Sequence, residues 1–176
     1  LLVFLASMVI AREVEAGTLQ RLRITPTTSF DLLGGITIAL LLVGILSVLL
    51  TFWTAVALGF RSQGPLWVAI LIGALTSLSI IGIGMIVACF SKTVSQAFVI
   101  ANFPLGILMF LSGAIFPIPK VTLFTLGELQ IGLYDLLPPT HAVVALNKIL
   151  TLGAGFNEVI YEMTALLVLS VAYFAV

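Results

Sequence analysis

Residues Arg12 to Pro26, REVEAGTLQRLRITP, lie between two long apolar runs. This segment holds three of the seven basic residues and two of the seven acidic residues of the chain. A polar segment joined at both ends to apolar helices cannot lie in hydrocarbon, where charges and unpaired backbone groups are unfavourable. We therefore expect it to lie on one face of a membrane, where a soluble partner can reach it.

The composition of the whole chain indicates a membrane protein. Of its 176 residues, 61% are hydrophobic and 8% are charged, and the mean hydropathy is +1.31. Soluble domains have about 25% charged residues. The net charge of zero argues against a nucleic-acid partner, and the single cysteine, Cys89, argues against a disulfide framework or a cysteine metal site. The predicted fold is an all-α polytopic bundle in a lipid bilayer, with no metal site.

Apolar runs separated by short polar turns predict the membrane crossings. Residues 1–10 are expected to be the end of a span that begins before the chain does, because ten residues cover only about 15 Å of helix. Complete spans are predicted at 32–59, 66–90, 94–112 and 157–176. Capping-box patterns mark the start of two of them, Thr28 with Asp31 and Thr93 with Gln96.

The polar loop at 11–31 is predicted to hold a short helix of its own. Gly17 breaks the preceding helix, and Thr18 can cap a new one from Leu19 to Ile24. Pro26 ends that helix, because the residue before a proline is pushed out of the helical region. The loop therefore contains a stiff element that a partner can grip.

Residues Gly113 to Gly155 are broken by several glycines and prolines. Neither Val121 to Leu137 nor Thr140 to Leu152 has the length and apolar character of a span. We interpret them as two short helices, interfacial or re-entrant, that face one aqueous side.

A stripe of small residues runs along the predicted span 66–90. Gly73, Ser77, Gly84 and Ala88 fall within about 60° of one another on a helix. Small side chains let a second helix approach closely, so the stripe predicts helix packing.

The distribution of basic residues predicts the orientation. If the segment from Arg12 to Pro26 is cytoplasmic, the loop at Lys92 is cytoplasmic as well, and 113–155 is external. The inside basic residues are then Arg12, Arg21, Arg23 and Lys92, and the outside ones are Arg61, Lys120 and Lys148. The inside residues lie in short loops and the outside ones are spread over a longer sequence, as the positive-inside rule expects.

Two motifs carry a resemblance to a known family. The segment EVEAGTLQRLRITP (13–26) resembles the first cytoplasmic loop of the type-2 ABC transporter permeases. SQAFVIANFPLGILMFLSGAIFPIP (95–119) and LLPPTHAVVALNKILTLG (136–153) resemble the last third of the same family. The resemblance implies that the chain corresponds to about the last two-thirds of a six-span permease. It departs from the family at 123–139, where LFTLGELQIGLYDLLPP lacks a further Leu-Pro and a tryptophan.

The resemblance implies a subunit of an exporter in the cell membrane. Two permeases, identical or homologous, are then each contacted by a cytoplasmic ATPase subunit, and the loop 11–31 is the coupling element. Its expected coupling residues are Glu13, Glu15, Gly17, Thr18, Arg21 and Pro26. ATP and magnesium are expected on the ATPase, and no catalytic residue or cofactor is expected on this chain. The alternative for this loop is a solvated segment that only orients the protein.

The absence of charged residues from the first three complete predicted spans independently favours ATP, and not an ion gradient, as the energy source. Between Leu32 and Ser112 the only charged residues are Arg61 and Lys92, both at turns. Ion-coupled carriers place an ionisable group inside the membrane. No lysine lies in a phosphate-loop motif, so ATP must bind elsewhere. One alternative is an ion-coupled carrier, whose ionisable group would be Glu162 or would lie before residue 1. The other is a membrane subunit or assembly factor that does not transport.

The span 94–112 contains the candidate substrate path. Asn102 lies two residues before Pro104, which we expect to kink the helix. A polar amide there needs a partner, a water-filled path or a ligand. The candidate path residues are Phe98, Asn102, Phe103 and Phe110. Such a path suits an amphipathic drug, a lipid or a lipid-linked glycan, and ordinary packing is the alternative for each residue.

Three ionisable residues near the end of the chain have simpler interpretations. His141 follows two prolines, and its expected role is packing at a helix start. Glu158 and Glu162 lie one helical turn apart. A solvated face is expected for them, with a substrate or cation contact as the alternative.

Overall fold

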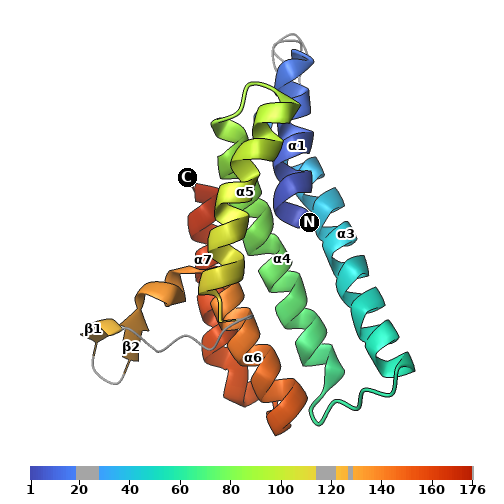
Figure 1. The fold of residues 1–176 in the computed structure, drawn as a ribbon, viewed down its shortest axis with the longest axis vertical. Helices are drawn as coiled ribbons and strands as arrows, with labels where there is room; N and C mark the ends of the chain where they lie inside the picture. The colour runs from blue at the N-terminus through green and yellow to red at the C-terminus, as the bar shows by residue number, and fades with distance from the viewer. Residues whose placement is uncertain (19–27, 114–121, 127–128, 176) are drawn as a thin grey trace.

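The computed structural model describes residues 1–18, 28–113, 122–126 and 129–175 and is a helical bundle, as predicted (Figure 1). Its elements are α1 (Leu2–Glu15), α3 (Ser29–Ala57), α4 (Leu66–Cys89), α5 (Val94–Leu111), β1 (Thr122–Leu126), β2 (Leu129–Gly132), η1 (Leu133–Leu136), α6 (Pro138–Leu152), η2 (Phe156–Val159) and α7 (Ile160–Ala175). Among the described residues, four helical segments are long and apolar enough to cross a membrane: Phe30–Ala57, Leu66–Cys89, Val94–Leu111 and Phe156–Ala175.

Local sequence signals explain where several helices begin and end. α1 ends at Glu15, and Gly17 follows with a φ of 68°, a backbone conformation that glycine adopts without strain. At the start of α3, Thr28 and Asp31 form the predicted capping box. The helix predicted from Leu19 to Ile24 lies outside the described residues.

Helix α4 lies at the centre of the bundle and contacts α1, α3, α5, α6 and α7. The small residues on α4 make these contacts close. A β-carbon added at Gly84 would lie 2.5 Å from the Ala6 Cβ of α1, and one added at Gly73 would lie 2.8 Å from the Val48 side chain of α3. Ser77 packs in the same way against Gly44 of α3. The predicted role of the small-residue stripe in helix packing is thus confirmed, with α1 and α3 as its two partners.

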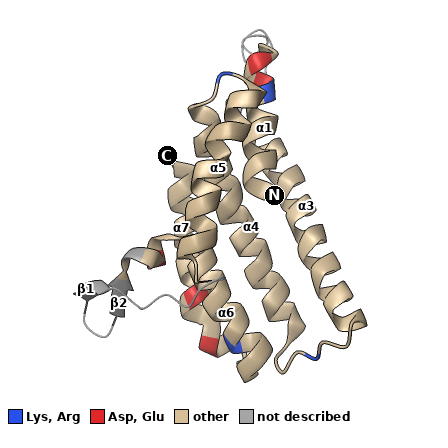
Figure 2. Ribbon diagram, viewed as in Figure 1, with Lys and Arg blue, Asp and Glu red and all other residues tan. Residues whose placement is uncertain are grey.

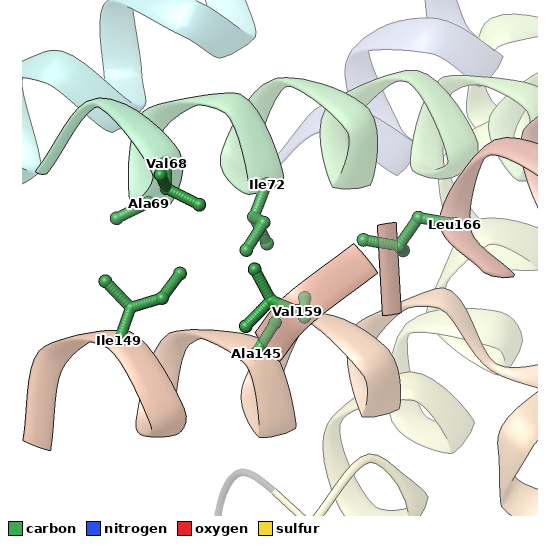
Figure 3. Packing of buried hydrophobic residues seen from close by; sticks show 8 residues of the cluster. Val68, Ala69, Ile72, Ala145, Ile149, Val159 and Leu166 are labelled. Carbon is green, nitrogen blue, oxygen red and sulfur yellow. The ribbon is translucent and has the colours of Figure 1, made fainter. Parts of the chain in front are cut away.

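Helix α6 is too short to span the membrane and packs against α4 and the start of α7. Its 15 residues are about 22 Å long. Figure 3 shows Ile149 and Ala145 of α6 facing Val68 and Ile72 of α4. Gly153, in the left-handed conformation with a φ of 71°, ends the helix. This element corresponds to the second short helix predicted in the 113–155 region.

The first short helix predicted there, Val121 to Leu137, is wrong. Strands β1 and β2 form an antiparallel hairpin in which Leu126 pairs with Leu129, and η1 follows. Threonine, phenylalanine and isoleucine favour strands, and the two residues between the strands begin with a glycine, which is typical of a two-residue hairpin. Among the described residues, β1 and β2 are the only strands.

Contacts between turns show that the helices alternate between two ends of the bundle. At one end, Glu15 of α1 contacts Val94 at the start of α5. At the other end, the Gln63 N–H, in the turn between α3 and α4, donates to the Leu150 carbonyl near the end of α6. In Figure 2, the ribbon segments of the charged residues lie near these two ends and beside the hairpin, and the middle of the bundle has none. The bundle therefore has two polar ends, and which of them is cytoplasmic stays a prediction.

Candidate functional site

The C-terminal end of α1 carries the first candidate residues. Glu13 is half-buried and Glu15 is exposed, both in the last turn of the helix. A carboxylate at a helix C-terminus is repelled by the partial negative charge of the free carbonyls. Glu15 therefore needs a favourable partner elsewhere.

The start of α5 provides that partner. The Val94 N–H, 79 positions along the chain, donates to Glu15 Oε2 at 2.9 Å. Two nearby backbone donors have local partners: the Gln96 N–H donates to Thr93 Oγ1 at 3.2 Å, and the Lys92 N–H donates to Gln96 Oε1 at 3.0 Å. Because the N-terminus of a helix carries partial positive charge, it favours a carboxylate. The sequence analysis recognised the Thr93 cap but did not find the contact with Glu15.

The remaining coupling candidates are only partly described. Gly17 and Thr18 closely follow α1, and in the part of the chain that the structure describes no atom beyond the chain neighbours lies within 4 Å of a β-carbon added at Gly17. Arg21 and Pro26 lie outside the described residues. The structure thus brings Glu13, Glu15, Gly17 and Thr18 to the same end of the bundle as the start of α5, without testing their role.

The candidate path residues lie on an exposed side of α5. Phe103 is 79% exposed, Phe110 is 61% exposed and Phe98 is 50% exposed. Asn102 is also exposed, and its Nδ2 donates to the Phe98 carbonyl at 2.8 Å. The ring of Phe98 lies 5.1 Å from that of Phe4 in α1. The amide thus has one partner within its own helix, and the other described residues leave most of the aromatic side of α5 uncovered.

The opposite end of the bundle holds an ion pair that the sequence analysis missed. Lys148 Nζ of α6 lies 2.6 Å from Glu162 Oε1 of α7. The Glu162 side chain is 5% exposed, so the expectation of a solvated face is wrong for this residue, whereas Glu158 is exposed. The reason is that α6 packs across the start of α7 and covers it.

His141 also lies at this end. Its Nε2 is 2.9 Å from the Asp135 carbonyl, and its ring meets that of Tyr161 edge to face at 6.0 Å. The side chain is buried at the first turn of α6. Its predicted packing role at a helix start is confirmed.

Comparison with known proteins identifies one family. The sequence model described as ABC-2 type transporter matches residues 1–151, which include α1, α5 and nearly all of α6. No curated protein and no solved structure matches the chain.

Proposed function

Because the chain belongs to the ABC-2 type transporter family, we propose that it is the membrane-spanning part of an ATP-driven exporter. The family and the four apolar helices make it a multi-pass permease subunit of an ABC transporter. Its proposed location is the plasma or inner membrane of a cell. The proposed substrate is an amphipathic compound such as a drug, a lipid or a lipid-linked glycan.

The energy is proposed to come from ATP and magnesium bound to a partner ATPase subunit. The sequence has no phosphate-loop motif, and α4 and α5 contain no charged residue. The carboxylate of Glu162 is the group that an ion-coupled carrier would need in α7, but Lys148 already neutralises it. This observation favours ATP over an ion gradient.

We propose that the ATPase binds the loop 11–31. Glu13, Thr18 and Arg21 would contact the ATPase. Gly17 and Pro26 would mark the two ends of the bound segment. One observation carries the proposal: α1 runs without interruption from the polar end into the bundle. Ala6 and Ala11 of α1 are fully buried, and α1 packs on both α4 and α5. A force on the polar end of α1 therefore reaches the centre of the bundle through close contacts.

The exposed side of α5 is proposed to line the substrate path together with a second permease, identical or homologous. Phe98, Asn102, Phe103 and Phe110 combine aromatic surface with one amide, which suits an amphipathic ligand. The other described residues of one chain leave most of this side of α5 uncovered, and a second permease packed against it would enclose it.

The test is export from membrane vesicles that contain the permease and its co-expressed ATPase. We expect export that needs ATP and that stops when the ATPase carries a hydrolysis-deficient substitution. Export that follows a proton or sodium gradient and ignores ATP would instead support the ion-coupled carrier. Equal export from vesicles without the permease would show that the chain does not transport.

A further inference from the structure

We propose that Glu15 is a positioning residue that transmits movement of the loop 11–31 directly into α5. The proposal rests on the proposed function, since it assumes that an ATPase moves this loop. It differs from a direct role of Glu15 in binding the ATPase. The structure has the Glu15 carboxylate bonded within the chain, to the backbone of α5.

The position of Glu15 suits a link between the loop and the path. Glu15 is the last residue of α1 and lies two positions before Gly17, where the chain leaves the helix. Val94 is the first residue of α5, and Asn102 lies eight residues, or about 12 Å, further along the same helix. One hydrogen bond therefore joins the moving end of α1 to the helix that carries the candidate path residues.

The chemistry of the contact makes it directional and reversible. A carboxylate that accepts a hydrogen bond from a backbone N–H at a helix start is stabilised in two ways. Its own charge strengthens the bond, and the helix end carries partial positive charge. Both Glu15 and the residues around Val94 are reached by solvent, so water can replace either partner when they separate. A second contact, between the rings of Phe4 and Phe98, lies deeper along the same two helices and keeps them together.

The backbone conformation at the start of α5 allows the Val94 N–H to be removed by substitution with proline. Val94 is the first helical residue, a position that accepts proline because its N–H has no partner within the helix. Thr93 has φ −135° and ψ 157°, the extended conformation that a residue before proline adopts. Val94→Pro therefore deletes the bond to Glu15 and leaves the helix intact. Val94→Ala is its matched control, because it removes side-chain atoms and keeps the N–H.

The experiment measures ATP hydrolysis and substrate export in the same vesicles, so that export per ATP can be calculated. We expect Glu15→Ala and Val94→Pro to keep the ATPase bound and hydrolysing, and to lower export per ATP by about tenfold. Val94→Ala should export more per ATP than Val94→Pro, and Glu15→Gln, which keeps an acceptor oxygen, should restore part of the loss. Because the two groups form one bond, the Glu15→Ala/Val94→Pro double variant should be no worse than either single variant.

Three results would overturn the proposal. The first is export per ATP by Val94→Pro equal to that of the unchanged protein. The second is a double variant in which the two losses multiply, and the third is loss of the ATPase from purified Glu15→Ala complexes, which would make Glu15 a direct ATPase contact. If the unchanged complex does not export with ATP at all, the proposed function fails instead, so the two failures are distinguishable.

Discussion

The helices are held together by different contacts at the two ends of the bundle. At the end that holds Glu15 and Val94, one exposed hydrogen bond of 2.9 Å connects the last residue of α1 to the first residue of α5. At the opposite end, the Lys148–Glu162 ion pair is partly buried, with the Glu162 side chain enclosed and Lys148 reaching solvent, and it lies beside the apolar core that α4, α6 and α7 share. Water can replace the hydrogen bond between Glu15 and Val94. Separating Lys148 from Glu162 would expose apolar core and leave the Glu162 carboxylate without its partner.

Close backbone packing strengthens the contrast. A β-carbon added at Gly64 would lie 2.6 Å from the Ile149 carbonyl oxygen and 3.1 Å from that of Ala154. At the other end, among the described residues and apart from its chain neighbours, no atom lies within 4 Å of a β-carbon added at Gly17. We therefore expect movement where α1 meets α5, and we expect the end that holds α6 to stay rigid.

The largest expected effect is on binding of the ATPase at the α1 end. We propose that Glu13 meets a basic surface of the ATPase, so Glu13→Lys would bring like charges together and destabilise the complex by several kcal/mol. Insertion should be normal, because added positive charge on the cytoplasmic side agrees with the positive-inside rule. Co-purification of the ATPase is the measurement, and Asp31→Asn is the control because Asp31 is bonded to Thr28 in its own cap. Retention of the ATPase by Glu13→Lys would remove Glu13 from the proposed contact.

The next effect concerns the ion pair at the α6 end. Lys148→Ala leaves the Glu162 carboxylate buried and unpaired, which should destabilise the protein by about 2–3 kcal/mol, less than for a fully buried pair because the Lys148 side chain is 39% exposed. Thermal unfolding in mild detergent measures the loss. Glu158→Ala, at an exposed acidic residue nearby, should have almost no effect. The Lys148→Met/Glu162→Leu double variant should recover most of the stability, and a double variant as unstable as Lys148→Ala would contradict the explanation.

A smaller loss of stability is expected at Gly64. Gly64→Ala forces the added methyl group against two backbone carbonyls, and overpacking of this kind destabilises by about 1–3 kcal/mol. Gly34→Ala is the matched control: no atom lies within 4 Å of the added carbon, and alanine favours a helix over glycine. Unfolding temperatures of the two variants should therefore shift in opposite directions. If Gly64→Ala were as stable as Gly34→Ala, the α6 end would not be the rigid one.

The smallest effect is expected in the path. Asn102→Leu removes the exposed amide from α5 and should change the relative export of two test substrates by a few fold, without changing the amount of assembled complex. Thr164→Val is the control, because Thr164 is an exposed polar residue of α7 that bonds to a carbonyl of its own helix. If Asn102→Leu and Thr164→Val export every tested substrate equally, Asn102 has a structural role only.

Most of the helices could be predicted because their signals are local. The run from Leu66 to Cys89 is bounded by a proline and by a polar turn, and α4 lies within one residue of the predicted span. The capping residues Thr28 and Thr93 mark the starts of α3 and α5. The hairpin was missed because the alternation of its side chains is weak against an apolar background, so its glycines were interpreted only as breaks between helices.

From the sequence alone it follows that this is a helical membrane protein, where most of its helices begin and end, and which residues are polar enough to lie outside hydrocarbon. These properties depend on composition and on neighbours within a few residues. The tertiary structure decided the partners of Glu15 and Glu162, which lie 79 and 14 positions away along the chain. Such pairs depend on how whole helices pack, because only packing brings the end of α1 to the start of α5 and lays α6 across the start of α7.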